Sequence, residues 1–335
     1  MVNDDSPAFH SDLTRARFMP PTSATRGNRR LLRALTRIGR GRAPKGGELV
    51  DLGNGASVRV HRPADATATD AGARRPGILY LHGGGLIIGS AVQGDPLCRR
   101  MADELGAVAA SVGYRLPPEH PYPAPLDDCY AALQWLAAQP DVDPARIAVI
   151  GLSAGGGLAA SLALRARDRG EFALAGQVLS YPMLDDRTDE SAAAHPRMLR
   201  LWNGPSNRLG WGMYLGAGGA LARRADAAGP ASSADAASPA AAASPLDADE
   251  LALAVPARRT DLSGLPPTWI GVGTLDLFHA EDVEYARRLT EAGVPTDLHV
   301  IEGAYHGFDA SEPTAAVSID FIQRQVDALR RMLAV

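Results

Sequence analysis

The segment Ile147-Ala-Val-Ile-Gly-Leu-Ser-Ala-Gly-Gly-Gly157 joins an apolar run to Gly-x-Ser-x-Gly and then to a stretch rich in alanine and leucine. This order predicts a buried strand, a sharp turn that presents Ser153, and a helix. Gly151 and Gly155 would let neighbouring backbone pass without a Cβ clash. A glycine-rich turn used only for packing has the same pattern, so the rest of the chain must decide whether Ser153 is a nucleophile.

A second motif, His82-Gly-Gly-Gly85, follows an apolar run that predicts another buried strand. Attack of a serine on an acyl carbonyl creates an oxyanion, which needs two or three preorganised hydrogen-bond donors. We expect the amides of Gly84 and Gly85 to supply two donors, and that of Ala154, the residue after the serine, to supply the third. A phosphate-binding loop is the alternative, but the Lys-Ser/Thr pair of a P-loop and the spacing of a dinucleotide fingerprint are missing.

A nucleophilic serine needs a base, and the base needs an orienting carboxylate. Asp276 follows a strand predicted at 268–273, and His306 lies in the loop after a strand predicted at 296–301. The order serine, acid, histidine along the chain is that of α/β-hydrolases. The competing histidines and acids fall inside a predicted strand or on a predicted helix: His299, His279, Glu281 and Asp282.

With these motifs in place, the chain resembles the bacterial hormone-sensitive-lipase-like carboxylesterases of the α/β-hydrolase fold, over roughly residues 48 to 335. Further motifs carry the resemblance: Tyr114-Arg115-Leu116, Pro118-Glu-His-Pro-Tyr-Pro123, Asp127-Asp128, Tyr181-Pro182 and Leu265-Pro-Pro267. It implies the same roles that the spacing suggested: Ser153 as nucleophile, His306 as base, Asp276 as orienting acid, and Gly84, Gly85 and Ala154 as oxyanion donors.

Three positions depart from the pattern of that family. Leu152 stands where an acidic residue is frequent, Gly113 where aspartate is common, and Leu86 where an aromatic residue commonly follows the glycines. These changes leave the triad intact. Because they flank the serine turn, we expect Leu86 and Leu152 to affect the shape of the acyl pocket.

The order of elements predicts an α/β fold with a mostly parallel sheet and helices on both faces. Gly53-Asn-Gly55 marks a hairpin between strands at 48–52 and 56–60. Further strands are expected near residues 77–82, 107–112, 146–151, 176–180, 268–273 and 296–301. The candidate catalytic residues would then follow the carboxyl ends of strands, where such folds bind ligands.

Two parts of a helical cap are expected around the catalytic domain of residues 47–335. The arginine-rich segment 1–46 has leucine and isoleucine at helical spacing, which predicts a helix over the active site with a solvated arginine face; a basic amphipathic helix on a membrane is the alternative. The other part is expected at about 186–216. Its Trp202, Trp211 and Tyr214 would line a substrate pocket or pack between cap and core.

Composition bounds the remaining possibilities. At 335 residues and 46% apolar content the chain can bury one large core, and its formal charge of −4 gives no general attraction to nucleic acid. No apolar run approaches the ~18 residues of a membrane span, and no signal peptide is recognised, so the cytoplasm is expected. Cys98 and Cys129 are expected to be buried free thiols. An alanine-rich stretch at about 219–250 predicts a flexible surface loop.

The sequence therefore predicts a serine carboxylesterase that hydrolyses small to medium acyl esters through an acyl-enzyme intermediate. It needs no metal or organic cofactor. A lactone, amide or carbamate hydrolase would use the same triad, and a small-molecule receptor on this fold is a further alternative, against which the presence of His306 argues. The resemblance also implies a homodimer as one assembly that the chain could form.

Overall fold

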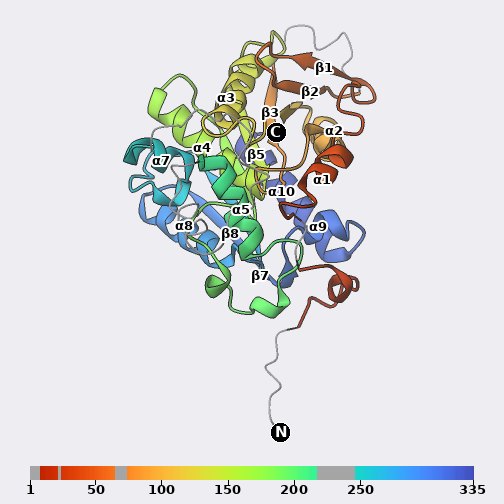
Figure 1. Ribbon diagram of the computed structural model, residues 1–335. Helices are drawn as coiled ribbons and strands as arrows, with labels where there is room; N and C mark the ends of the chain where they lie inside the picture. The colour runs from red at the N-terminus through yellow and green to blue at the C-terminus, as the bar shows by residue number, and fades with distance from the viewer. Residues whose placement is uncertain (1–7, 22–23, 65–73, 217–245) are drawn as a thin grey trace.

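The computed structural model describes residues 8–21, 24–64, 74–216 and 246–335. They form one eight-stranded sheet in the order β1-β2-β4-β3-β5-β6-β7-β8 (Figure 1). β2 is antiparallel to both of its neighbours, and all other pairs are parallel. The strands are β1 (Gly47–Asp51), β2 (Ser57–His61), β3 (Arg75–Leu81), β4 (Val108–Gly113), β5 (Val142–Leu152), β6 (Gly176–Ser180), β7 (Thr268–Leu275) and β8 (Thr296–Tyr305).

Helices cover both faces of the sheet, so the predicted fold class is confirmed. Strand residues alternate between two cores: Leu79 and Leu81 of β3 belong to a core with α3, α4 and α8, whereas Ile78 and Tyr80 belong to a core with α2 and α10. The helices are α1 (Arg29–Thr36), α2 (Asp95–Leu105), α3 (Ala124–Ala137), α4 (Ala154–Arg169), α5 (Gly204–Leu215), α7 (Ala248–Ala254), α8 (His279–Glu291), α9 (Phe308–Ser311) and α10 (Ala316–Leu333). Short 3₁₀ turns are η1 (Ala16–Phe18), η3 (Ala91–Gly94), η4 (Glu190–Ala192), η5 (Pro196–Met198) and η7 (Pro256–Arg258).

All eight expected strands are present, and several are longer than the sequence indicated; the longer carboxyl ends of β7 and β8 bear on the site. β7 reaches Leu275 and β8 reaches Tyr305, so Asp276 and His306 follow their strands directly, with no intervening loop. Cys98 and Cys129 are buried free thiols, as expected. No helix in the described parts of the chain has the length and apolarity to cross a bilayer.

The two expected parts of the cap contact each other. Leu201 donates a backbone hydrogen bond to Pro20 (2.8 Å), and the Ser206 hydroxyl donates one to the carbonyl of Ala24 (2.8 Å). Most of the alanine-rich stretch expected at about 219–250 lies outside the described residues. Its last residues do not form a loop, because α7 begins at Ala248, after Asp247 has capped the helix by accepting a hydrogen bond from the amide of Glu250 (2.8 Å).

The side of α1 that faces the core differs from the one expected. Arg29 and Arg33 are buried, whereas Leu31, Leu35 and Ile38 are exposed. Arg29 and Arg33 face the core because Glu119 and, for Arg33, backbone carbonyls accept hydrogen bonds or ion pairs from them there. Of the expected apolar positions, only Leu32 is partly buried against the core. The expectation of a solvated arginine face was therefore wrong for Arg29 and Arg33, whereas Arg30 and Arg37 are exposed as expected.

Candidate active site

Ser153 lies between the end of β5 and the start of α4 in a strained backbone conformation, with φ 56° and ψ −120°. Two contacts to the end of β6 hold it there. Its amide donates to the carbonyl of Ser180 (2.8 Å), and its carbonyl accepts from the amide of Met183 (3.0 Å). The serine is therefore fixed by the backbone, independently of its side chain.

Close packing explains the glycines around this turn. A Cβ atom at Gly151 would overlap with the carbonyl of Gly155, and one at Gly155 would overlap with the carbonyl of Leu81 in β3. The start of α4 can approach the sheet this closely only because both positions lack a side chain. The Gly-x-Ser-x-Gly pattern had predicted this need for glycine at both positions.

The structure brings Ser153, His306 and Asp276 together at the ends of three strands. Nε2 of His306 is 2.9 Å from Oγ of Ser153, and Nδ1 is 2.8 Å from Oδ2 of Asp276. The other oxygen of Asp276 accepts from the amide of Phe278 (3.0 Å). An acceptor at Nδ1 favours the tautomer that carries its proton there, which leaves the lone pair of Nε2 directed at the serine hydroxyl.

Aromatic rings fix the plane of His306. Tyr181 and Phe278 present their edges to it, with ring centroids at 5.0 and 5.2 Å, and the Tyr181 hydroxyl donates to Oδ1 of Asp309 (2.7 Å). Sequence reasoning assigned no role to Tyr181 or Phe278. The only signal for either was the Tyr181-Pro182 pair quoted for the resemblance, so their packing on His306 could be found only from the tertiary structure.

The loop after β3 presents bare amides beside Ser153. Gly84 and Gly85 have φ of 119° and 57°, and the carbonyl of Gly84 accepts from the amides of Ile87 and Ile88 at 3.0 and 2.9 Å. Within the described residues, no backbone or side-chain acceptor is bonded to the amides of Gly84 and Gly85. Both glycines line the same cavity as Ser153, so these amides are free to bind an oxyanion.

His82 supports this loop from behind. Its ring stacks on Tyr114 with centroids 4.1 Å apart, its Nδ1 lies 2.8 Å from the carbonyl of Gly83, and the Tyr114 hydroxyl donates to its carbonyl (2.7 Å). Burial lowers the pKa of His82 to about 4. A neutral ring with its proton on Nδ1 satisfies the carbonyl of Gly83 without placing a charge beside the site.

A cavity of about 550 Å³ opens over Ser153 and His306. Two of the residues expected to bind substrate, Leu152 and Trp202, line it, and Trp202 also packs against Gly85, where a Cβ atom would overlap its ring. Other apolar side chains complete the wall: Ile88, Pro96, Leu97, Leu201, Pro313 and Ile322.

The other three expected substrate-binding residues do not line this cavity. Leu86, at φ 67°, is turned into the core, and Trp211 and Tyr214 are buried where α5 packs on the core. The Tyr214 carbonyl accepts from the amide of Tyr122 (2.8 Å), and the rings of these two tyrosines meet edge to face. Their role is packing, which sequence reasoning had left open for the two cap residues.

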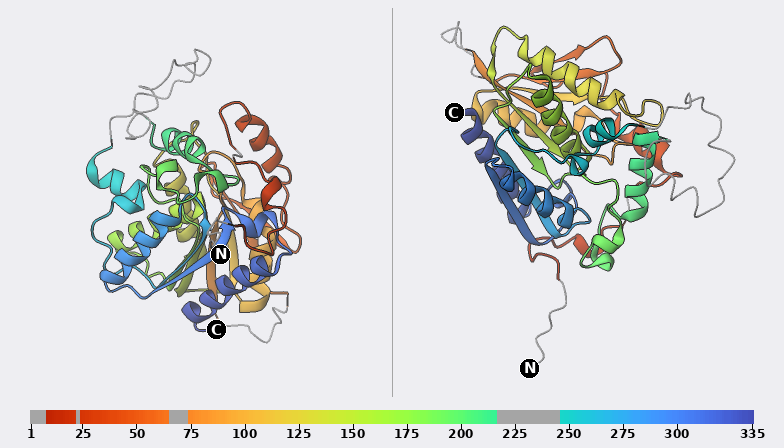
Figure 2. Two further views of the ribbon diagram at one scale, coloured as in Figure 1. Left: turned by 90° about the horizontal axis from the view of Figure 1, so that it is seen from below. Right: turned by 90° about the vertical axis from the view of Figure 1, so that its left-hand side faces the viewer.

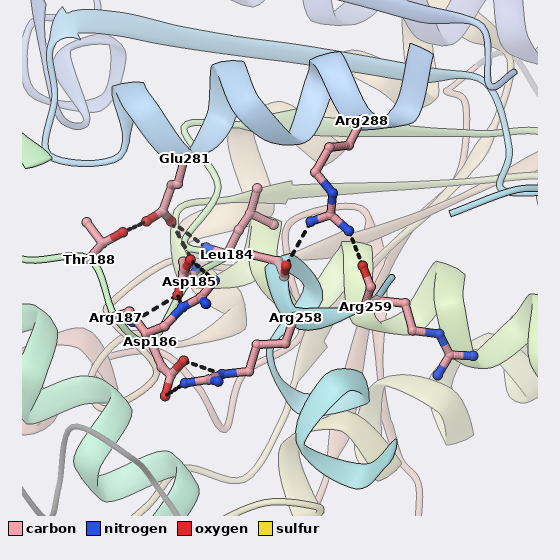
Figure 3. A network of polar contacts seen from close by, with 10 residues as sticks. Leu184, Asp185, Asp186, Arg187, Thr188, Arg258, Arg259, Glu281 and Arg288 are labelled. Carbon is pink, nitrogen blue, oxygen red and sulfur yellow. Dashed lines mark hydrogen bonds and ion pairs between the residues drawn. The ribbon is translucent and has the colours of Figure 1, made fainter. Parts of the chain in front are cut away.

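Of the competing acids on α8, Glu281 holds the segment that leads into the 186–216 insertion (Figure 3). Glu281 accepts from the amides of Leu184 (2.7 Å) and Asp185 (3.2 Å) and from the Thr188 hydroxyl, and burial raises its pKa. Burial also raises the pKa of its neighbour Asp282. Within the described chain, neither is bonded to His306, and no group of three or more histidine, cysteine or acidic side chains could hold a metal ion.

Known proteins that are similar to this chain include esterases and ester hydrolases. Residues 78–310 match the family model described as alpha/beta hydrolase fold. "Esterase LipI" of Mycobacterium tuberculosis is 34% identical over 78% of this chain and 74% of its own, and "Ethyl acetate hydrolase" of Pseudomonas putida is 32% identical over 75% and 70%. Among solved structures, "Bacterial Heroin Esterase" matches with a TM-score of 0.76 and 36% identity, over 97% of this chain and 98% of that one.

We expect the His82 ring to titrate with a midpoint of about 4, far below the usual value of about 6.5. Because the unfolded chain binds more protons than the folded one between these values, His82 should destabilise the fold as pH falls from about 6.5 to about 4, with no further change below. A ¹H–¹⁵N titration of the histidine rings measures the midpoint, and the His82→Gln variant identifies the signal. A His82 midpoint near 6.5 would contradict the buried neutral ring.

Proposed function

The chain belongs to the hormone-sensitive-lipase-like carboxylesterases of the alpha/beta hydrolase fold, and from this premise we propose that Ser153, His306 and Asp276 perform its reaction. The protein is a carboxylic ester hydrolase. One observation carries the proposal for the residues: an unbroken chain of hydrogen bonds links the serine hydroxyl, the imidazole and the buried carboxylate.

The proposed first step transfers the acyl group to Ser153. Oγ attacks the ester carbonyl carbon while Nε2 of His306 accepts the hydroxyl proton. The tetrahedral intermediate then expels the alcohol, which takes the proton back from Nε2. Asp276 holds the ring in register and stabilises the imidazolium, without itself becoming protonated.

Water completes the cycle in the proposed second step. It gives a proton to Nε2 of His306 and attacks the acyl carbonyl carbon; the tetrahedral intermediate then expels Oγ of Ser153, which takes the proton back from Nε2 as the carboxylic acid is released. In both steps the negative charge develops on the former carbonyl oxygen. We assign its stabilisation to the amides of Gly84, Gly85 and Ala154, and removal of one such donor typically costs about 10²- to 10³-fold in rate.

The cavity supports a preference for small to medium acyl groups. Its wall is mostly apolar, and Trp202 and Leu201 from the 186–216 insertion close part of it. A relative named for ethyl acetate hydrolysis agrees with a small substrate. For the cellular compartment we propose the cytoplasm, whose reducing conditions suit the buried, unpaired thiols of Cys98 and Cys129.

We expect Ser153→Ala to lower the kcat for p-nitrophenyl acetate by at least about 10⁴-fold, because the nucleophile is removed while the fold is kept. The matched control is Ser161→Ala on α4, the helix that follows Ser153, since Ser161 is also buried but its hydroxyl makes no bond among the described residues. This control should retain most of the activity. Equal activity in the two variants would show that the reaction does not pass through Ser153.

We expect kcat/KM for p-nitrophenyl esters to peak at acyl chains of about two to eight carbons and to fall roughly tenfold or more for palmitate, because the cavity is closed by bulky side chains. Leu97→Ala removes part of the cavity wall and should move the optimum to longer chains. Leu251→Ala, a partly buried leucine outside the cavity, should leave it unchanged. Best activity on palmitate in the wild type would overturn this preference.

A further inference from the structure

Helix α1 and the turn after it present apolar side chains to solvent. Leu31, Leu35 and Ile38 are 62%, 54% and 70% exposed. Leu31 and Leu35 are one helical turn apart and share a face, and the amide of Ile38 bonds to the carbonyl of Leu35, which continues the row. These three residues, called the α1 stripe below, lie at the periphery of the molecule, where Figure 2 (left) shows α1 projecting.

Buried polar contacts lock the stripe outward. On the opposite side of α1, Arg33 donates from Nε to the carbonyl of Ile87 (2.6 Å), from Nη1 to Oε2 of Glu119 (2.5 Å) and from Nη2 to the carbonyl of Pro117. Rotating the helix to bury the stripe would break all three bonds and leave the Arg33 guanidinium without its acceptors. The exposed apolar row is therefore a fixed feature of the surface.

The charge around the stripe is strongly one-sided. From Thr14 to Gly47 the chain has ten lysines and arginines and no aspartate or glutamate, so the remainder, with 24 cations against 38 acids, carries a formal −14. The cations of this segment that solvent reaches include Arg26, Arg30, Arg37, Arg42 and Lys45. A neighbouring cavity of about 340 Å³ is lined by Arg37 and Arg40, which add to the positive field, and by Arg33 and Arg115, whose charges are paired with Glu119 and Asp128.

We propose that the α1 stripe and its surrounding cations dock the protein on the surface of an anionic lipid bilayer. An apolar row flanked by arginines fits the boundary between acyl chains and headgroups, where the row is buried and the cations meet phosphate groups. A second copy of this chain fits less well. Symmetric pairing through the stripe would set the same cluster of cations against itself.

Docking would keep the catalytic cavity near the lipid. Arg33 ties α1 to Ile87, in the loop whose Gly84, Gly85 and Ile88 line that cavity. An apolar ester dissolved in the bilayer would then be concentrated beside Ser153. This consequence rests on the proposed function, whereas the docking itself does not.

Vesicle sedimentation tests the proposal without using catalysis. The protein is mixed with vesicles of phosphatidylglycerol and phosphatidylcholine, or of phosphatidylcholine alone, at low and high salt. We expect binding to the anionic vesicles that weakens with salt. Combined Leu31→Ser, Leu35→Ser and Ile38→Ser substitutions should lower the partition coefficient about 100-fold, since apolar burial is lost. Combined Arg30→Gln, Arg37→Gln and Arg42→Gln should lower it by about fivefold per cation.

The matched control is Ile319→Ser on α10, where an isoleucine 53% exposed lies next to Asp320. It should bind like the wild type. All the substituted side chains are exposed and lie outside the catalytic cavity, so circular dichroism and hydrolysis of dissolved p-nitrophenyl acetate should be unchanged in every variant. A variant that loses vesicle binding but keeps its circular dichroism spectrum and its hydrolysis of p-nitrophenyl acetate has lost the docking surface and not its fold.

Two results would overturn the proposal. One is a wild type that does not bind anionic vesicles, and the other is a triple-serine variant that binds them as well as the wild type. If light scattering showed a wild-type dimer that the triple-serine substitution converts to a monomer, with no vesicle binding, the stripe would be a contact between copies of the chain. Loss of esterase activity alone would bear on Ser153 and not on docking.

Discussion

The strained turn at Ser153 is the constraint on which the rest of the site depends. A non-glycine residue at φ 56° is held because Ser180 at the end of β6 and Met183 just beyond it bond to its amide and carbonyl, and because α4 packs directly against the sheet. That approach excludes a side chain at Gly151 and Gly155. With the serine fixed by backbone, His306 and Asp276 need only follow their own strands to complete the hydrogen-bond chain.

The same close packing joins the catalytic acid to the cap. Asp276 directly follows β7, and Glu281, in the first turn of α8, accepts hydrogen bonds from the amides of Leu184 and Asp185 and from the hydroxyl of Thr188. This anchors the start of the insertion whose Trp202 covers Gly85. A displacement of α8 would thus reach the acid, the cavity wall and the oxyanion loop together. Burial also lowers the pKa of His82, so its ring stays neutral beneath that loop and adds no charge to the site.

Most of the fold could be predicted because its signals are local. Most of the central strands contain an apolar run that ends at a turn, and the two glycines and the serine at the end of β5 lie within five residues of one another. What escaped prediction depends on residues far apart in sequence. Arg33 is buried because Ile87, Pro117 and Glu119 happen to meet there, and nothing within α1 indicates it. In the same way, only tertiary packing decides that Trp202 lines the cavity while Trp211 does not.

Covalent labelling tests most directly whether Ser153 is the nucleophile. Diethyl p-nitrophenyl phosphate reacts with an activated serine to leave a stable phosphoryl adduct, because the adduct resembles the tetrahedral intermediate but is not readily hydrolysed. We expect one adduct per chain, placed on Ser153 by peptide mass spectrometry, with complete loss of activity. An adduct on another residue that abolishes activity while Ser153 stays unmodified would contradict this assignment.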